Sequence, residues 1–496
     1  MELRTARSPQ VTHEQTQGRG INRALRGLLT TAALTLALQG NQVRAEDSAN
    51  VVPTPKDCHS VMFHFPHESS LADEGHISDG AIATEMELVT DSADAFSEGL
   101  DPDLEFFPLT TTPIGFAEVC EAQDTAELTQ NGASDIQDVP QYELADMEII
   151  QDEWSYPDED VMRIMRPEET WGRGATGARA NLGVVVIDTG VQTDHPQLVG
   201  HISSTQKCFS EVKEGFKSTC PNGKEEDDSA YVNDQLASHG TFMAGFVTTV
   251  SQGEVIPVQV TTAELDTSGE IKQYHLSGKS IARAYDWVIS SNGRVAAVNA
   301  SYGHGEYVSP AKCQEENPTD KELIGRIIQR GIPFVVSTGN TPGLNFTSSP
   351  ACLSFSADNV DGLIAVGSST NADTMAFHTS MAEWVGVLAP GEHAVSTLPG
   401  SGFGMGTGTS GSAALTSGAV QVLRDIWGGG SPDFMERVLM QTGVRIADQR
   451  QTEDGKVNGL SASRVDFGGI AERWVADHIR GNPKDRIVLP FLLKKW

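Results

Sequence analysis

Four polar residues in the second half of the chain have the types and the order that acyl-transfer chemistry needs: Asp188, His239, Asn340 and Ser410. A serine hydroxyl is a poor nucleophile at neutral pH, so it needs an imidazole to take its proton and a carboxylate to orient that imidazole. An attacked amide carbonyl becomes an oxyanion, which needs hydrogen-bond donors already in place. The four residues supply one group for each task.

The elements predicted around these residues bring polar groups to one edge of a sheet. The strand-like apolar runs are residues 182–187, 254–260, 295–298, 333–338 and 363–366, and the helix-like segments are residues 281–290 and 323–330. Apolar strands separated by helices favour an α/β fold, with a mainly parallel sheet covered by helices on both faces. Asp188, Ser301 and Asn340 each follow a strand. Because functional groups in such folds gather beyond the carboxyl ends of strands, we expect the three to share one rim.

The other two reactive residues are predicted at the starts of helices. His239 opens a helical stretch of small residues, and Ser410 precedes a proline-free apolar segment at residues 411–427. A serine at such a start lies near unpaired N–H groups and the positive end of the helix dipole. Negative charge that develops beside Ser410 would be stabilised there.

Short motifs in a fixed order resemble those of the subtilisin-like serine peptidases (subtilases). They are Val185-Val186-Ile187-Asp188-Thr189-Gly190-Val191 with His195-Pro196, His239-Gly240-Thr241 with Ala244-Gly245, Asn299-Ala300-Ser301-Tyr302-Gly303, Ser337-Thr338-Gly339-Asn340, Ala389-Pro390-Gly391 and Gly408-Thr409-Ser410. Each motif alone is weak, but the whole set in this order is highly specific. The resemblance implies a subtilisin-like fold and a serine endopeptidase that acts on proteins or peptides.

The resemblance also implies a role for each residue of the triad. Asp188 would orient His239, which would act as general base and then as general acid, and Ser410 would form the acyl-enzyme. The side-chain amide of Asn340 and the backbone N–H of Ser410 would form the oxyanion hole. This is the Asp, His, Ser chain order of subtilisin.

The residues implied for substrate binding lie in the two remaining motifs. Ser301, Tyr302 and Gly303 would present the backbone of an edge strand to an extended peptide, which adds to it as a further strand. Gly339 would let the peptide approach closely.

Three positions depart from the pattern of the family. Phe242 stands where subtilases usually have a second histidine, and we expect it to pack against the sheet. Gly411-Ser412-Ala413-Ala414 replaces the usual Met-Ala-x-Pro after the nucleophile. Gln197 stands where many subtilases have a calcium-ligating aspartate, so structural calcium is unsupported there. The chemistry requires no cofactor, and we assign no metal ligand.

Three other interpretations compete with this one. An aspartic peptidase would share the Asp188-Thr189-Gly190 signature but needs a second such motif, and the sequence has none. An α/β-hydrolase esterase would need G-x-S-x-G, which Ser412 interrupts, and the order Ser, Asp, His. A catalytically weak or silent subtilase fold used as a binding module is the alternative that stays open.

The charge is distributed very unevenly along the chain. Its formal net charge is −32, from 35 basic and 67 acidic residues, and residues 46–160 hold 29 of the acidic residues against one basic residue, Lys56. So acidic a chain is not expected to bind nucleic acid, because such binding relies on basic residues that neutralise phosphates.

The same distribution divides the chain into four regions. Residues 1–45 are expected to be a signal peptide, because arginines precede a short apolar run and a small-x-small cleavage site. Residues 46–160 are either an acidic pro-segment or a disordered region, residues 161–480 the catalytic domain, and residues 481–496 a C-terminal tail. By its position alone the acidic region corresponds to the pro-segment of the family, a possible inhibitor of the enzyme.

The leader and the cysteines both suggest export. We therefore expect a secreted or extracytoplasmic protein, made as a precursor, with membrane anchoring possible if the leader is not cleaved. The chain has 6 cysteines, which allow 15 connectivities when all are paired. Pairing of sequence neighbours is the simplest of these: Cys58–Cys120, Cys208–Cys220 and Cys313–Cys352.

Overall fold

The structure is a computed structural model. It describes residues 59–67, 77–101, 104–120, 122–144, 148–151, 156–234, 237–291, 294–353, 361–451 and 456–481. The predicted signal peptide and residues 482–496 of the predicted tail lie outside this part of the chain.

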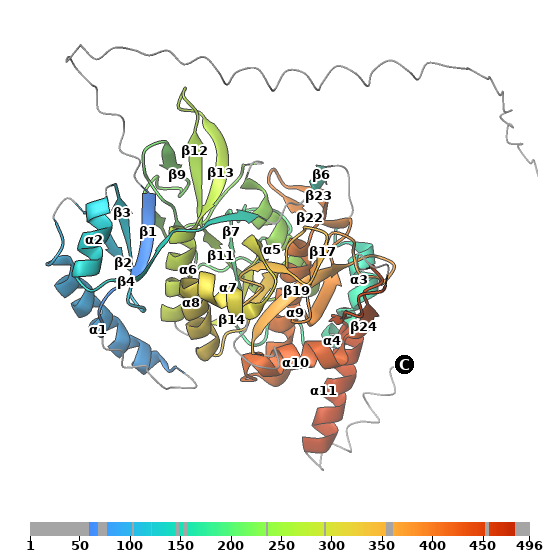
Figure 1. The fold of residues 1–496 in the computed structure, drawn as a ribbon. Coiled ribbons are helices and arrows are strands. Elements are labelled where there is room, and N and C mark those ends of the chain that lie inside the picture. The colour runs from blue at the N-terminus through green and yellow to red at the C-terminus, as the bar shows by residue number, and fades with distance from the viewer. Residues whose placement is uncertain are drawn as a thin grey trace, which may run out of the picture. The chain divides into compact units, whose positions relative to one another are not determined.

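A ten-stranded sheet forms the centre of the main body, which comprises residues 156–481 (Figure 1). The inner strands pair in parallel, and only the two outermost strands are antiparallel to their neighbours. In spatial order the strands are β10 (Glu226–Asp227), β8 (Lys207–Phe209), β11 (Glu254–Gln259), β7 (Gly183–Asp188), β14 (Val295–Ala300), β16 (Phe334–Ser337), β19 (Leu363–Ser369), β21 (Val387–Pro390), β25 (Ser461–Arg464) and β24 (Val444–Ala447).

Helices cover both faces of this sheet, because its strands are apolar on both sides. Along β7, Val184 and Val186 belong to one hydrophobic core, while Val185 and Ile187 belong to another. The first core contains residues of α5 (His239–Val250), α9 (Thr409–Trp427), α10 (Pro432–Thr442) and α11 (Phe467–Gly481), and the second contains residues of α6 (Gly278–Ser290) and α8 (Pro318–Gln329). The predicted fold class is confirmed.

The acidic region is folded where the structure describes it, and residues 59–138 form what we call the N-terminal lobe. Its elements are the antiparallel strands β2 (Phe106–Pro108), β3 (Ile114–Val119), β1 (His59–His64) and β4 (Ser134–Asp138), with helices α1 (Asp79–Ser97) and α2 (Ala122–Gln130). One face of this sheet, with Val61 and Phe63, packs on α1 in a core of its own. The other face, with Met62 and Phe116, joins the core that holds α6 and α8. Figure 1 shows the lobe beside these two helices.

Smaller sheets extend the rim of the main body. One has the order β18 (Thr347–Ser349), β15 (Tyr302–Tyr307), β5 (Gln141–Leu144), β13 (Ile271–Ser277), β12 (Thr261–Leu265) and β9 (Phe216–Ser218); another has β22 (Ala394–Leu398), β23 (Gly402–Thr407) and β6 (Glu148–Gln151); a third pairs β17 (Gly343–Leu344) with β20 (Ser380–Met381). The remaining helices are α3 (Glu159–Met165), α4 (Glu168–Trp171) and α7 (Pro310–Glu316). Strands β5 and β6, which precede the main body in the sequence, thus pair with strands of its rim.

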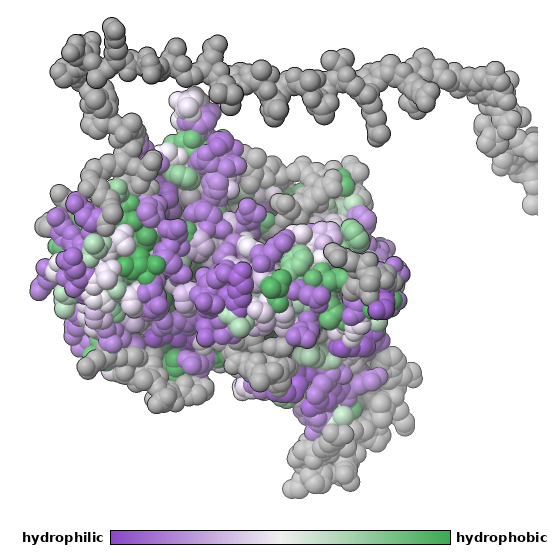
Figure 2. Space-filling model, in the orientation of Figure 1, coloured by the Kyte–Doolittle hydropathy of each residue, from purple (hydrophilic) through white to green (hydrophobic). Residues whose placement is uncertain are grey.

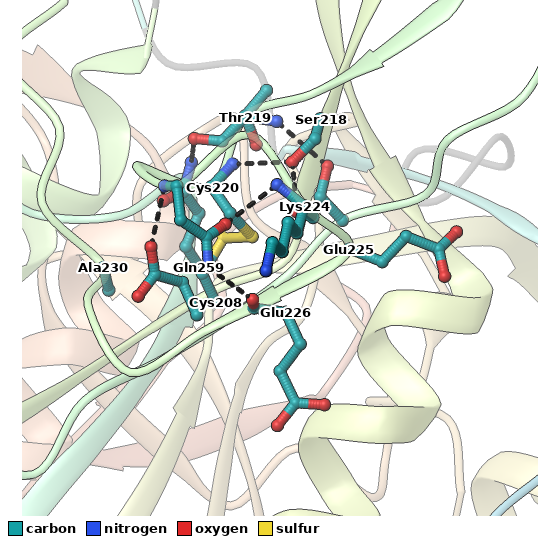
Figure 3. Close-up of a disulfide and its surroundings, with 12 residues drawn as sticks. Cys208, Ser218, Thr219, Cys220, Lys224, Glu225, Glu226, Ala230 and Gln259 are labelled. Carbon is teal, nitrogen blue, oxygen red and sulfur yellow. Dashed lines mark hydrogen bonds between the residues drawn. A yellow bond between two sulfur atoms is a disulfide. The ribbon is translucent and has the colours of Figure 1, made fainter.

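Two of the three predicted disulfides are confirmed, Cys208–Cys220 and Cys313–Cys352. Cys120 is also disulfide-bonded, and its predicted partner, Cys58, lies outside the described residues. Figure 3 shows the Cys208–Cys220 bridge, which joins β8 of the main sheet to the segment that follows β9. The Gln259 side chain donates to the carbonyl of Thr219 at 3.2 Å, so the end of β11 supports the same turn.

The visible surface is mostly hydrophilic. Figure 2 shows hydrophobic residues gathered in two places, one over the N-terminal lobe and one over the part of the main body that holds β17 and β19. Across the residues described, no helix combines the length and the apolar character needed to cross a bilayer.

A buried carboxyl group in α10 should make the stability of the fold depend on pH. Glu436 accepts hydrogen bonds from the backbone N–H groups of Asp361 and Gly362, each at 2.9 Å. Burial raises its pKa from 4.5 to about 8. The folded state therefore keeps the proton after the unfolded chain has lost it, and stability falls as the pH rises from about 4.5 through about 8.

We expect Glu436→Gln, which retains an acceptor but no ionisable group, to remove this loss. The variant should match the wild type in urea unfolding near pH 4.5 and exceed it by about 1 to 4 kcal/mol at pH 9. Glu159→Gln on an exposed turn of α3 is the control and should show no such difference. A Glu436→Gln gain of equal size at both pH values would contradict the assignment.

Candidate active site

Asp188 and His239 form a buried hydrogen-bonded pair. Asp188 ends β7 and His239 opens α5. The Nδ1 atom of His239 lies 2.9 Å from both carboxylate oxygens of Asp188, and Oδ1 also accepts from the backbone N–H of Thr189 at 2.7 Å. The exposed fraction is 0% for Asp188 and 6% for His239, so the pair is shielded from water.

Two glycines allow this pair to meet. A Cβ atom on Gly240 would lie 2.1 Å from the carbonyl oxygen of Gly190, which is backbone and cannot move aside. Gly190 itself has a φ of +94°, a conformation that favours glycine. The hydroxyl of Thr189 accepts from the N–H of Gly240 at 2.9 Å. The start of α5 is therefore tied directly to the turn that follows β7.

Ser410 is the second residue of α9 and is fully buried. Its hydroxyl donates to the carbonyl of Ser301 at 3.4 Å, and the hydroxyl of Ser301 donates to the carbonyl of Ser410 at 3.1 Å. The Nε2 atom of His239 has no hydrogen-bond partner among the described residues. In this conformation the imidazole nitrogen is thus open, and the serine hydroxyl is engaged elsewhere.

Asn340 is held against the start of α9. Its Oδ1 atom accepts from the backbone N–H of Thr409 at 2.8 Å and from the hydroxyl of Thr409 at 2.9 Å. The N–H of Gly339, whose φ is +106°, donates to the same hydroxyl at 3.2 Å. Because the amide oxygen faces Thr409, the amide nitrogen is the end of Asn340 that can face a neighbouring oxyanion.

The strand order explains how residues far apart in sequence come together. Strands β7, β14 and β16 are adjacent and parallel. Asp188 ends the first, Ser301 follows the second, and Asn340 comes three residues after the third. All three lie at the carboxyl edge, as their positions after strands predict.

An extended segment lies along this rim. Strand β5 is inserted between β13 and β15, with Tyr142 opposite Leu276 and Leu144 opposite Tyr302. On the other side of the rim, β6 pairs with β23 and brings Glu148 opposite Thr407, close to the start of α9. The chain therefore reaches both sides of the site, and the residues between, 145–147, lie outside the described part.

A cavity of about 310 Å³ opens beside this segment. Its lining residues include Asn340, Gly303 and Gly339 together with His304, Glu306 and Ser348. The predicted site residues Asn340, Gly303 and Gly339 thus share one depression, and the Tyr302 ring is fully buried behind it.

The departures from the family pattern are accommodated within the fold. Phe242 is fully buried and makes an edge-to-face contact with Phe246, their centroids 4.9 Å apart. Ala414 is buried within an uninterrupted α9. Gln197 offers no carboxylate, and no group of three or more His, Cys, Asp or Glu in the described ranges is placed to hold a metal ion. The residues present do not fit the calcium site implied at Gln197.

Sequence reasoning missed several residues that shape this site. The Thr189 hydroxyl ties the start of α5 to the turn after β7, and Thr409 holds Asn340. In the sequence these threonines were noted only as members of the motifs that contain Asp188 and Ser410. Strand β13, the second edge that holds β5, gave no signal, because its alternation is interrupted by polar residues. Asp320, which hydrogen-bonds Tyr142 in the structure, precedes the helix predicted at residues 323–330, and nothing in the sequence marked it for a role.

Comparison with protein families identifies the main body. The model of the subtilase family matches residues 180–463, more than half of the chain. The chain belongs to the subtilase family. It is a subtilisin-like serine protease, and its triad-type residues fall within the matched segment.

Individual relatives support the same family at low identity. The chain is 27% identical over 268 residues to the major intracellular serine protease of Bacillus subtilis (strain 168), covering 53% of this chain and 74% of that protein. It is 28% identical over 295 residues to an extracellular protease of Xanthomonas campestris pv. campestris, covering 51% of this chain and 45% of that one.

A solved structure shows the same fold over more of the chain. The epidermin leader peptide processing serine protease of Staphylococcus aureus superposes with a TM-score of 0.60 at 14% identity, covering 84% of this chain and 99% of that one. The likeness concerns the fold alone.

The close approach of the Gly240 and Gly190 backbones should be necessary for the contact between Asp188 and His239. We expect Gly240→Ala to push α5 away from the turn after β7, lengthen the contact between Asp188 and His239, and lower kcat/KM at least about tenfold. Gly429→Ala is the control, because a Cβ there would meet nothing within 4 Å. Rates are measured per site titrated with an active-site reagent, so that misfolded protein is not counted. Equal activity of the two variants would contradict this account.

Proposed function

We propose that the protein is a secreted serine endopeptidase that cleaves peptide bonds through an acyl-enzyme and is made as a precursor. The arrangement of Asp188, His239 and Ser410 on one rim carries the proposal. The Asp188 carboxylate accepts from Nδ1 of His239, so the open Nε2 atom has the lone pair that a general base needs. Relatives that include an extracellular protease are consistent with export.

The first chemical step requires one local movement. The Ser410 hydroxyl would turn from the Ser301 carbonyl, 3.4 Å away, toward Nε2 of His239. The imidazole would then take its proton while Oγ attacks the substrate carbonyl. The charge of the resulting imidazolium would be stabilised by Asp188. His239 would next protonate the leaving amine, and water would hydrolyse the ester by the same route.

The oxyanion would be bound by two donors. They are the side-chain amide of Asn340 and the backbone N–H of Ser410, which lies in the first turn of α9, where N–H groups lack helical partners. Such donors stabilise the transition state because they are already oriented when charge develops. The bonds of Thr409 to Asn340 would supply that orientation.

The hydroxyl of Thr409 should therefore affect turnover more than substrate binding. Removal of one oxyanion donor usually lowers kcat about 10²–10³-fold, so we expect Asn340→Ala to fall in that range. Thr409→Val loosens the donor without deleting it, and kcat should fall about tenfold with little change in KM. Thr409→Ser retains the hydroxyl and should stay near wild type. A Thr409→Val variant with unchanged kcat would show that Thr409 does not position Asn340.

The N-terminal lobe and β5 together have the form of a built-in inhibitor. Strand β5 occupies the position between β13 and β15 where an extended substrate would add to both edges. The N-terminal lobe, which precedes β5 in the chain, is bound to helices α6 and α8. The folded lobe therefore holds β5 in the groove. A substrate could enter only after β5 had left.

Directional hydrogen bonds hold the lobe on these helices. The buried Asp286 carboxylate of α6 accepts from the backbone N–H groups of Thr110 and Thr111 at 3.0 and 2.7 Å and from both hydroxyls. On α8, Arg326 donates to the carbonyl of Thr111 at 2.8 Å. Charge-assisted bonds of this kind are among the stronger ones, so release of the lobe requires more than fraying of β5.

The register of β5 and β6 indicates where a precursor would be cut. Leu144 is paired on one side of the rim and Glu148 on the other, which favours cleavage between these two residues. We expect N-terminal sequencing of the secreted wild-type protein to find a new terminus at residues 145–148. Ser410→Ala should retain the lobe and fail to react with a fluorophosphonate probe that labels the wild type. Identical processing of both proteins would exclude self-cleavage, and a wild type that the probe does not label would favour a silent binding module.

The comparisons do not favour the silent module. The family and the named relatives are serine proteases, and each triad-type residue is present. The departures at Phe242 and Ala414 are packed inside the fold and remove no polar group from the rim.

A further inference from the structure

Strand β5 inserts one large side chain into the main body. Tyr142 is 4% exposed, whereas its neighbours Gln141 and Glu143 face outward. Side chains alternate along a strand, so any strand bound in this register would direct one residue into the same site. We call this site the Tyr142 pocket.

Aromatic groups form the walls of the Tyr142 pocket. The ring of Tyr142 stands edge-to-face against Tyr302 and His304, with centroid distances of 5.6 and 4.7 Å. Leu276 of β13 is opposite Tyr142 in the ladder and is buried in the same core. The shape and the apolar surface suit a flat six-membered ring.

A carboxyl group lies at the closed end of the pocket. The phenol of Tyr142 donates to Oδ2 of Asp320 at 2.5 Å. Asp320 is 7% exposed and lies in the first turn of α8, and its burial raises its pKa. The Ser349 hydroxyl and the His304 ring also lie near this carboxyl. A buried carboxyl that loses a donor recovers less of the cost of its desolvation, so the Tyr142 hydroxyl contributes to its stability.

We propose that Asp320 makes the mature enzyme select substrates with a tyrosine at the position that Tyr142 occupies here, on the amino side of the cleaved bond. The inference rests on the proposed endopeptidase function and specifies its substrate class. Tyrosine satisfies both parts of the pocket, since its ring fits the aromatic walls and its hydroxyl reaches Asp320. Phenylalanine fills the same walls but leaves the carboxyl without this donor. Leucine lacks both the ring and the hydroxyl.

The alternative is a basic side chain, such as that of arginine, which the Asp320 carboxyl could also attract. The walls favour the phenol, because the rings of Tyr302 and His304 hold a planar ring edge-on. His304 also lies beside the carboxyl. A guanidinium has five donors, whereas in the structure one carboxylate oxygen of Asp320 accepts from the single hydroxyl of Tyr142. The pocket therefore matches a phenol better than a guanidinium. We therefore expect the pocket to select tyrosine, and the test includes arginine as the alternative.

The test uses peptides that match residues 137–151 and differ only at position 142, as Tyr, Phe, Leu or Arg. Cleavage by the processed wild-type enzyme is followed by mass spectrometry, and kcat/KM is measured for each. A site built to bond a hydroxyl discriminates against the analogue that lacks it, so we expect Tyr to exceed Phe by about tenfold to a hundredfold. In Asp320→Ala the ratio of Tyr to Phe should fall to about one. Glu436→Gln, a buried acid outside the groove, is the matched control and should keep the wild-type ratio.

A second measurement covers the case in which the peptides bind but are cut slowly. Peptides of residues 137–144, with Tyr or Phe at position 142, compete with digestion of a casein substrate. The Tyr form should inhibit the wild type about tenfold more strongly or better, and the two should be equal against Asp320→Ala.

The outcomes separate this inference from the function on which it rests. Equal rates and equal inhibition for Tyr and Phe in the wild type, a preference for Arg, or a Tyr preference that survives Asp320→Ala would each overturn the tyrosine pocket and leave the peptidase intact. Failure to digest casein, together with no labelling of Ser410 by the fluorophosphonate, would overturn the proposed function and the inference with it.

Discussion

The contact between the end of β7 and the start of α5 is the constraint on which the rest of the site depends. A carboxylate can orient an imidazole only within hydrogen-bond reach, and here that reach exists because the backbones meet at Gly190 and Gly240 without a side chain between them. Thr189 closes the same junction by accepting from the N–H of Gly240. The parallel sheet then fixes the other groups relative to this junction, since neighbouring strands end at one edge. A small change in the junction would therefore misplace the imidazole with respect to the whole rim, however well the sheet itself is packed.

The same rim explains why a strand from outside the main body binds there. Without β5, strands β13 and β15 would each leave unpaired backbone groups toward the groove, and such edges attract other chains. In this structure β5 satisfies both edges at once. The charge of the acidic region is compatible with that role, because the body presents basic groups where the lobe rests. Arg330 lies 2.5 Å from Asp79, and Arg326 donates to the lobe backbone. Complementary charge of this kind favours specificity of association more than affinity.

The sequence predicted the parallel sheet, its helices and the rim positions of Asp188, Ser301 and Asn340, because these follow from local patterns. Apolar β-branched runs determine buried strands, and polar residues directly after them must lie at the sheet edge. The fold of the acidic region was not predictable by the same means. Its strands are short, its helices are rich in acidic residues, and one of its two sheet faces, with Met62 and Phe116, is buried in the core that also holds α6 and α8. Composition therefore left pro-segment and disorder as equal alternatives. The insertion of β5 was equally invisible, since it depends on two edges that are distant in sequence from it and from each other.

Asp320 shows why a residue can remain uninterpreted in a sequence whose family is evident. In the sequence Asp320 is one acidic residue shortly before the helix predicted at residues 323–330. An acid near a helix start is explained by the helix dipole alone, so nothing in the sequence calls for another role. The structure changes that interpretation, because the helix dipole does not require burial, and Asp320 is buried beside a phenol rather than exposed at a helix end. Burial of a carboxyl weakens a fold unless a donor accompanies it. In the precursor that donor is Tyr142, which belongs to the segment that must leave. Loss of β5 would thus open the groove and take one hydrogen-bond donor from a buried acid, leaving the Ser349 hydroxyl and the His304 ring beside it. The vacated pocket therefore favours a ligand that brings a hydroxyl back.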